Sequence, residues 1–177
     1  MSRSFKKITK QDLQRLAAIA KEDRKDLFRR RAKTGRLYKN RLFAVALCQG
    51  AALHYLNLTG ANGIKDFDVW SFFEEHPERP FPYRRTYRAD FGDDKFGKTE
   101  GFPHFRGRVV DLIGRSMKNV NRASPVDTLR RYLRQGAAKR KASRMPWNWH
   151  LAQKAVILIE PDELLGTIVW PEKPLTR

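Results

Sequence analysis

The first part of the chain shows apolar residues at helical spacing between basic ones. Thr9-x-x-Asp12 has the pattern of a capping box, in which the two residues satisfy backbone N–H groups at a helix start. Lys and Arg fill the positions between the apolar ones, which are Leu13, Leu16, Ala17, Ala20, Leu27 and Phe28. This pattern predicts a basic amphipathic helix, and Gly35 is expected to end it.

Three short apolar segments further along the chain predict strands. Residues 42–47 are too short a run for a helix, and Gly50 separates them from residues 51–56, which suit the first turns of a helix. Residues 65–73 predict a second strand and residues 107–113 a third. Strands interleaved with helices in this way favour an α/β (α+β) fold, in which helices flank a small mixed sheet.

The C-terminal part predicts mostly helices. Ser124-Pro125-Val-Asp127 is typical of a helix start, and the apolar spacing continues it to about Ala137. Residues 150–159 resemble a further helix, and residues 165–170 suit a terminal strand or an extended tail. At 177 residues the chain is expected to be one domain (1–177), with a basic N-terminal helix over 1–38 and a helical part over 124–177.

Composition narrows the class of protein. The apolar fraction is 41%, which is ordinary for a globular domain, and no apolar run is long enough to cross a membrane. No N-terminal segment resembles a signal peptide, and Cys48 has no second cysteine with which to form an internal disulfide. We therefore expect a cytoplasmic protein that does not bind a membrane.

The charge of the chain is high and unevenly distributed. The net charge is +18; residues 1–47 hold 15 Lys and Arg against 4 acids, and residues 109–150 hold 10 against 2. Residues 65–75 reverse the balance, with four acids against one lysine. Such a field attracts polyanions and favours RNA as a partner, although it is also compatible with a merely soluble protein.

The basic residues expected to contact nucleic acid lie in three groups. Arginines interleave with aromatic residues in the segment 76–105, a combination that suits stacking on bases and pairing with phosphate. The alternative is an irregular flap whose aromatic residues pack on the sheet, and the other two groups could be solvated runs. The candidates are Arg29, Arg30, Arg31, Arg84, Arg85, Arg88, Lys139, Arg140 and Lys141.

The acidic segment contains an Asp-x-Asp pair. Strand residues alternate between faces, so Asp66 and Asp68 are expected to point the same way. Such carboxylates repel each other unless a cation lies between them, and Mg²⁺ prefers one or two carboxylates together with phosphate oxygens. With Asp111 on a neighbouring strand, the pair could supply the carboxylates of a two-metal phosphoryl-transfer site. The alternative is two solvated acids at a strand end.

These segments together resemble the nucleotidyltransferase superfamily, which has the polymerase-β-like fold. The resemblance is greatest to its minimal members, among them the abortive-infection and toxin–antitoxin nucleotidyltransferases. It covers roughly residues 40–115, with 76–105 as an insert, and rests on the segments 45–53, 65–69 and 108–112. It implies that Asp66 and Asp68 bind both metal ions, Mg²⁺ or Mn²⁺, and that Asp111 binds the catalytic ion and acts on the attacking hydroxyl.

The phosphate-binding turn departs from the family pattern. Gln49 stands where the family has the first glycine of its pair, and Ala51 follows Gly50, so no serine hydroxyl is present. A Gln49 amide could replace it, and the turn opens a helix whose N–H groups suit phosphate. Lys65 could neutralise phosphate or reach into solvent. The expected nucleotide-binding residues are Gln49, Gly50, Lys65, Arg108 and Arg115.

The resemblance predicts transfer of a nucleoside monophosphate from an NTP to a hydroxyl acceptor, and the basic flanks favour RNA such as tRNA as that acceptor. Two alternatives stay open. One is a non-catalytic RNA-binding module or toxin–antitoxin component, which implies a possible cognate regulatory protein. The other is a small-molecule nucleotidyltransferase of the antibiotic type.

Overall fold

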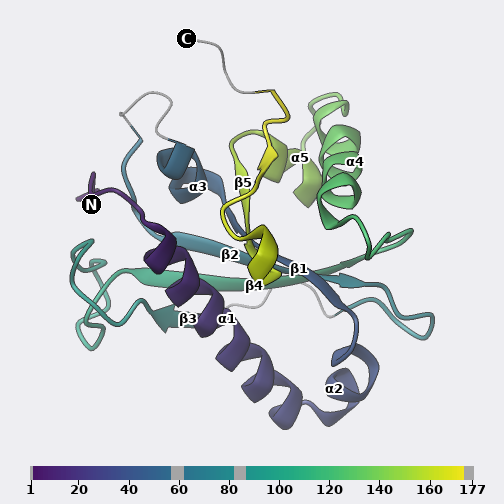
Figure 1. Cartoon of the computed structure of the whole chain (residues 1–177), viewed down its shortest axis with the longest axis horizontal. Coiled ribbons are helices and arrows are strands. Elements are labelled where there is room, and N and C mark those ends of the chain that lie inside the picture. The colour runs from purple at the N-terminus through teal and green to yellow at the C-terminus, as the bar shows by residue number, and fades with distance from the viewer. Residues whose placement is uncertain (1, 57–61, 82–86, 174–177) are drawn as a thin grey trace.

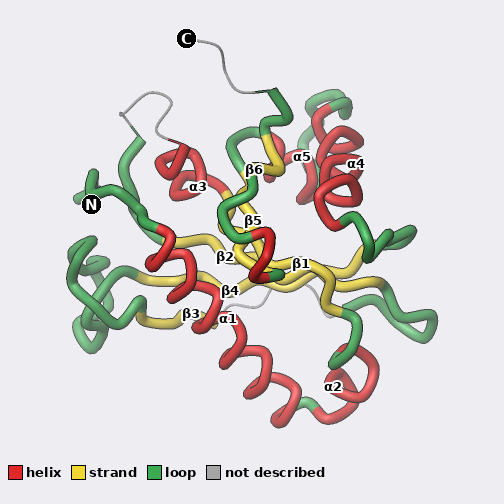
Figure 2. The backbone as a smooth tube through the Cα atoms, in the orientation of Figure 1, coloured by secondary structure: helices red, strands yellow, loops and turns green. Residues whose placement is uncertain are grey.

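A computed structural model of the chain describes residues 2–56, 62–81 and 87–173, and these form a mixed sheet flanked by helices (Figures 1 and 2). The predicted α/β class is therefore confirmed. The helices of this part are α1 (Lys10–Arg30), α2 (Ala32–Tyr38), α3 (Gln49–Leu56), α4 (Pro125–Ala137), α5 (Trp147–Ala152) and the short 3₁₀ helix η1 (Asp162–Leu164). The strands are β1 (Leu42–Cys48), β2 (Phe67–Glu74), β3 (Tyr87–Asp90), β4 (Val109–Met117), β5 (Val156–Glu160) and β6 (Ile168–Trp170).

The strand order is β3-β4-β2-β1-β5-β6, and its register brings three strand ends together. β2 and β4 are parallel, with Asp68 opposite Asp111. β1 is antiparallel to β2, with Cys48 opposite Asp68. The end of β1 therefore lies beside the beginnings of β2 and β4, and the chain turns into α3 at this same end of the sheet.

Side chains of the central strands alternate between two faces, and each face packs against its own helices. One cluster joins odd-numbered β1 and β2 residues to α1 and α3, including Leu13, Leu16 and Val69. The other joins mainly even-numbered residues of these strands, together with Phe43, to α4 and α5, including Trp70 and Leu129. Figure 1 shows α1 on one side of the sheet and α4 with α5 on the other.

The N-terminal helix begins as predicted but ends earlier. The Thr9 side chain accepts from the Asp12 N–H, and the Asp12 carboxylate accepts from the Thr9 N–H at 2.7 Å, so the capping box is confirmed. Gly35 is not the stop: α1 ends at Arg30, and Gly35 lies inside α2. A Cβ at Gly35 would lie 2.9 Å from the Phe28 carbonyl oxygen, so the glycine serves close contact between the two helices.

The prediction of a helix over residues 150–159 is wrong. α5 ends at Ala152, and Val156–Glu160 is β5, which pairs with β1 and β6. This strand is covered on both faces, so its apolar residues run continuously and carry no alternation that would distinguish them from a buried helix.

The prediction of a helical part over 124–177 is correct only for its first section, because β5 and β6 belong to the sheet. α4 spans Pro125–Ala137 as expected, and the terminal strand is β6. The Ser124 hydroxyl, however, does not cap a backbone N–H; it donates to the Asp127 carboxylate at 2.6 Å. The insert also contributes a strand of its own, since β3 pairs with β4. In the part of the chain described here, no helix is long and apolar enough to cross a membrane.

Candidate active site

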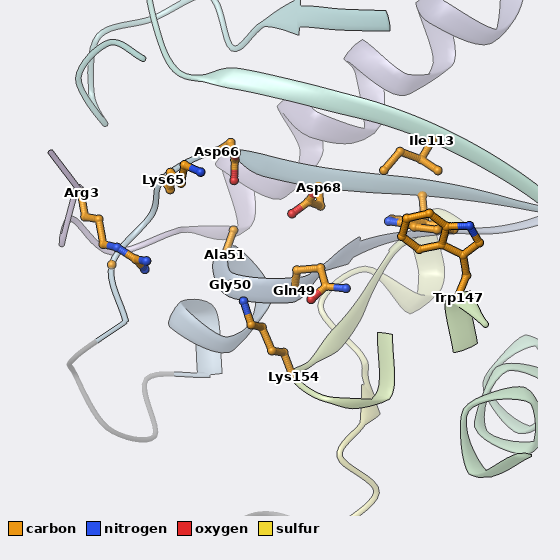
Figure 3. A pocket seen from close by; sticks show the side chains of 12 residues that line it. Arg3, Gln49, Gly50, Ala51, Lys65, Asp66, Asp68, Ile113, Trp147 and Lys154 are labelled. Atoms are coloured by element: carbon orange, nitrogen blue, oxygen red, sulfur yellow. The ribbon is translucent and has the colours of Figure 1, made fainter. Parts of the chain in front are cut away.

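A cavity of about 360 Å³ opens at the end of the sheet where β1 passes into α3 and β2 begins (Figure 3). One wall is polar and comes from the Gln49–Gly50 turn and the segment that leads into β2. The other wall is apolar and comes from β2, β4 and α5. The side chains that line the cavity include Arg3, Gln49, Lys65, Asp66, Asp68, Trp70, Ile113, Trp147 and Lys154.

Asp66 and Asp68 both line this cavity, and both are half-buried. Figure 3 shows their carboxylates on the same side of the strand, turned toward the Gln49–Gly50 turn, as the alternation predicted. Burial raises the pKa of Asp66 and the Asp111 charge raises it further, while Lys65, Lys154 and Arg108 act in the opposite direction. Asp66 therefore lies within electrostatic range of three cations and of the third acid.

Asp111 is placed beside the pair but is already engaged. It lies opposite Asp68 across the parallel β2–β4 pair, and on its other side it lies opposite Arg88 of β3. Arg88 Nε donates to Asp111 Oδ1 at 3.0 Å. Among residues 2–56, 62–81 and 87–173, no group of three acids, histidines or cysteines is placed to hold a metal ion. The three-carboxylate cup expected from the sequence is thus not preformed among these residues, and its third member is paired with Arg88.

Asp66 and Asp68 together suit one kind of metal site. Mg²⁺ is commonly held by one or two carboxylates and completes its shell with water and substrate phosphates. Asp66 and Asp68 line one side of a cavity that also has room for a ligand. The donor set therefore fits a divalent ion that arrives together with a nucleoside triphosphate.

Gln49 is the residue with the least ordinary backbone at the site. Its φ is +62°, in the left-handed region that favours glycine. Its N–H donates to the Ala155 carbonyl at 3.0 Å, and its side-chain amide donates to the His150 carbonyl at 3.3 Å. The amide expected to bind phosphate is therefore committed to α5, and Gln49 ties the turn to the C-terminal part.

Two cations that line the cavity, Lys154 and Arg3, were not predicted from the sequence. A Cβ built on Gly50 would lie 4.0 Å from Lys154 Nζ, so this ammonium lies against the turn at the start of α3. Arg3 lines the cavity from the N-terminal segment and donates to the Asn62 carbonyl at 2.6 Å. With Lys65, the described lining residues hold three cations and two carboxylates, so the cavity has an excess of positive charge that attracts an anion.

The structure separates the two predicted arginines from the cavity. Arg108 is 2% exposed and donates to the carbonyls of Phe96, Ser2 and Lys65 at 2.7, 2.9 and 3.4 Å, so it ties three segments together behind the site. Burial lowers the pKa of Arg108, and the Asp66 charge acts against that shift. Arg115 lies further along β4 and lines a different cleft. Of the expected nucleotide-binding residues, Gln49, Gly50 and Lys65 line the cavity.

The predicted nucleic-acid contacts are spread over the surface. Arg29 and Arg30 are exposed and both pair with Asp26, and Arg31 is exposed at the junction of α1 and α2. Residues 139–141 are exposed after α4, and Arg88 pairs with Asp111 as described above. Arg84 and Arg85 lie outside the described residues.

The apolar wall is built around two tryptophans whose rings are tilted against each other. Trp70 is 2% exposed, and its ring centroid lies 5.4 Å from that of Trp147, which is half-buried. Among the described residues, Trp70 Nε1 is buried with no hydrogen-bond partner. The wall therefore offers an aromatic surface beside the carboxylates, backed by an indole N–H without a protein acceptor.

In comparisons with known proteins, no protein-family model, no curated protein and no solved structure matches the chain.

Proposed function

We propose that this protein transfers a nucleoside monophosphate from an NTP to a hydroxyl acceptor in a metal-dependent reaction. One observation carries the proposal. Asp66 and Asp68 face the Gln49–Gly50 turn and Lys154 within a single cavity, so carboxylates for a divalent ion and cations for phosphate line the same space. Phosphoryl transfer needs this combination, because its catalysis rests on positioning and on neutralising phosphate charge.

Each wall of the cavity has a role in the proposal. Asp66 and Asp68 would hold Mg²⁺ or Mn²⁺, which would supply charge neutralisation at the bridging phosphates. Lys154, Lys65 and Arg3 would bind the triphosphate oxygens and stabilise the departing pyrophosphate. The half-buried Trp147 face would contact the base, since aromatic rings stack on any base without selecting its sequence.

In the proposed reaction, the acceptor hydroxyl oxygen attacks the α-phosphorus, and the bond from that phosphorus to the pyrophosphate oxygen breaks. The hydroxyl proton passes to Asp111, which lies opposite Asp68 in the sheet. Asp111 Oδ1 already accepts from Arg88 Nε at 3.0 Å, so Arg88 competes with the hydroxyl for this carboxylate. Arg88 therefore controls whether the third acid takes part.

The basic surface supports RNA as the acceptor. A net charge of +18 provides an attraction for polyanions that a small acceptor would not require. A second candidate function, RNA binding without turnover, is favoured by the Arg88–Asp111 ion pair, because that contact occupies the acid expected to act on the hydroxyl.

A label-transfer assay distinguishes the nucleotidyltransferase from an RNA-binding protein without turnover. The purified protein would be incubated with Mg²⁺, total RNA and each labelled NTP in turn, beside the variants Asp66→Asn and Asp68→Asn. The matched control is Asp162→Asn, an exposed acid on η1 remote from the cavity. We expect transfer by the parent protein and the control, and none by either site variant.

Two results would contradict the proposed reaction or its acceptor. RNA binding without transfer from any NTP, unchanged in both site variants, would overturn the enzymatic proposal in favour of the binding module. Transfer to a small hydroxylated compound but never to RNA would leave the chemistry standing and overturn the acceptor.

A further inference from the structure

We propose that a second cleft, between the C-terminal half of β4 and α4, binds a backbone phosphate of the RNA. The cleft has a volume of about 270 Å³ and is separate from the cavity at Asp66 and Asp68. The inference rests on the proposed function only in taking RNA as the partner; the interactions below do not depend on turnover.

The cleft concentrates positive charge that no lining acid compensates. Arg115, Lys118 and Arg131 line it, and no Asp or Glu is among its described lining residues. Glu75 lies on its flank, 3.7 Å from Lys118 Nζ, but that lysine side chain is 80% exposed, so the pair is weak. Within the described residues, neither Arg115 nor Arg131 lies within 4.0 Å of a carboxylate oxygen.

Both guanidinium groups lie beside neutral groups. Arg131 Nη2 donates to the Asn119 carbonyl, and Arg115 lines the cleft together with the Tyr132 phenol and acts on it electrostatically. Burial raises the pKa of Tyr132, which keeps the phenol neutral. A neutral partner positions an arginine without cancelling its charge, and each guanidinium has further N–H groups for a ligand.

Hydrogen bonds join the two segments that form the cleft, α4 and the turn after β4. Thr128 Oγ1 of α4 accepts from the Asn121 N–H at 3.1 Å and donates to the Asn121 carbonyl at 3.2 Å. Asn119, whose carbonyl accepts from Arg131, has a φ of +56° in the turn that leaves β4. Because the turn is anchored to α4, the arginines are positioned before a ligand arrives, which lowers the entropic cost of binding.

The cleft and the cavity share one face of β4. Asp111, Ile113 and Arg115 alternate with residues of the other face; Ile113 lines the cavity, and Arg115 lines the cleft. Four residues of strand separate Asp111 from Arg115 by about 13 Å. A phosphate held in the cleft would thus lie a short distance along the same strand from a hydroxyl that enters the cavity. The forked guanidinium matches the oxygens of a phosphate, which favours nucleic acid over other polyanions.

The test is the salt dependence of binding to a short fluorescein-labelled single-stranded RNA, followed by anisotropy between about 50 and 200 mM salt. The variant is Arg115→Gln with Arg131→Gln. Its matched control is Lys25→Gln with Arg36→Gln, which removes the same charge from cations that are exposed and paired with acids. Removing one cation that neutralises a phosphate lowers the slope of log affinity against log salt by about 0.7 for a single strand. We expect the decrease for two such cations in the variant and a smaller one in the control.

Equal decreases in variant and control would overturn the inference, since they would report overall charge alone. Competition by polyglutamate as effective as competition by RNA would also overturn it, because carboxylates would then serve as well as phosphates. Tyr132→Phe provides a second measurement with no change of charge, and it should weaken RNA binding by removing the phenol oxygen beside Arg115. A circular-dichroism melt of each variant checks its folding. Binding of Mg²⁺–ATP should be unchanged in the cleft variant, so failure of the cleft and failure of the proposed enzyme are distinguishable.

Discussion

At the scale of single residues, the ion pair between Arg88 and Asp111 limits the chemistry of the site. Asp111 is 20% exposed and Arg88 is 53% exposed, so this ion pair is partly screened by water. A pair of this kind contributes about 0.2–1 kcal/mol. A ligand that attracts the guanidinium, such as an RNA phosphate, has enough interaction energy to release the acid.

Replacing Arg88 should therefore strengthen metal binding. In Arg88→Gln the third carboxylate gains freedom beside Asp66 and Asp68, and Mn²⁺ affinity measured by calorimetry should rise by up to about fivefold. Arg88→Lys keeps the charge and should leave the affinity near that of the parent protein. Unchanged or weaker Mn²⁺ binding in Arg88→Gln would show that Asp111 does not contribute to an ion site.

The backbone of Gln49 lies in the left-handed region, which affects the stability of the fold. A side chain branched at Cβ tolerates that region poorly, whereas glycine adopts it freely. Gln49→Val should lower the free energy of unfolding by about 1–2 kcal/mol relative to Gln49→Gly. Neither variant can form the hydrogen bond to the His150 carbonyl, so each serves as the other's control. Denaturant midpoints measure the difference, and equal midpoints would contradict it.

At the scale of elements, the start of α1 is stabilised by a carboxylate with several donors. Burial raises the pKa of Asp12, but hydrogen bonds from Lys95 and Thr9 and the Lys95 charge outweigh it, so the pKa lies below the ordinary value of 3.8. Lys95 Nζ lies 2.5 Å from this carboxylate, which joins the insert to the helix.

A depressed pKa sets the direction of a pH effect. The folded protein binds the Asp12 proton less readily than the unfolded chain, so this contribution to stability is complete above pH 3.8 and is lost as the pH falls through the folded-state value. Asp12→Asn should cost about 0.5–2 kcal/mol near neutral pH, as expected when a helix cap is removed. Urea titrations from neutral to acidic pH should show this difference shrinking below pH 3.8; a constant difference would contradict the assignment.

Elements set by residues close in sequence could be predicted, whereas contacts that depend on strand pairing could not. The capping box, β1, the Gly50 turn and β2 are set by residues close in sequence, and their predictions match the structure. The one difference is that β2 begins at Phe67, so Asp66 lies just before the strand on which it was predicted. The apolar pattern of β5 predicts a helix instead, because burial on both faces removes alternation. Lys154 escapes prediction for a related reason: only the pairing of β1 with β5 brings it against the Gly50 turn. The Arg88 ion pair likewise depends on β3, a short strand inside an insert without periodicity.

At the scale of the whole molecule, the proposed site is assembled from distant parts of the chain. Arg3 comes from the N-terminal segment, Asp66 and Asp68 from the middle, and Trp147 and Lys154 from the C-terminal part. The segments are held by backbone interactions behind the cavity, including Ser4 with Ile64 and the carbonyls bound by Arg108. The cavity therefore depends on the folded domain as a unit, while its excess of cations follows the charge of the molecule.

Replacing Lys154 tests whether the excess of cations in the cavity serves to bind a triphosphate. Its ammonium lies against the turn that would receive the phosphates, so Lys154→Gln should weaken ATP binding more than AMP binding. The residue is exposed, so the decrease for ATP should be about 1 kcal/mol, or about fivefold. Lys141→Gln removes one exposed charge elsewhere and should affect neither nucleotide, whereas Lys154→Arg should retain most of the affinity. Calorimetry with both nucleotides gives the ratio directly. Equal decreases for ATP and AMP would place the lysine outside the phosphate site and leave the basic character of the molecule as the only attraction for the ligand.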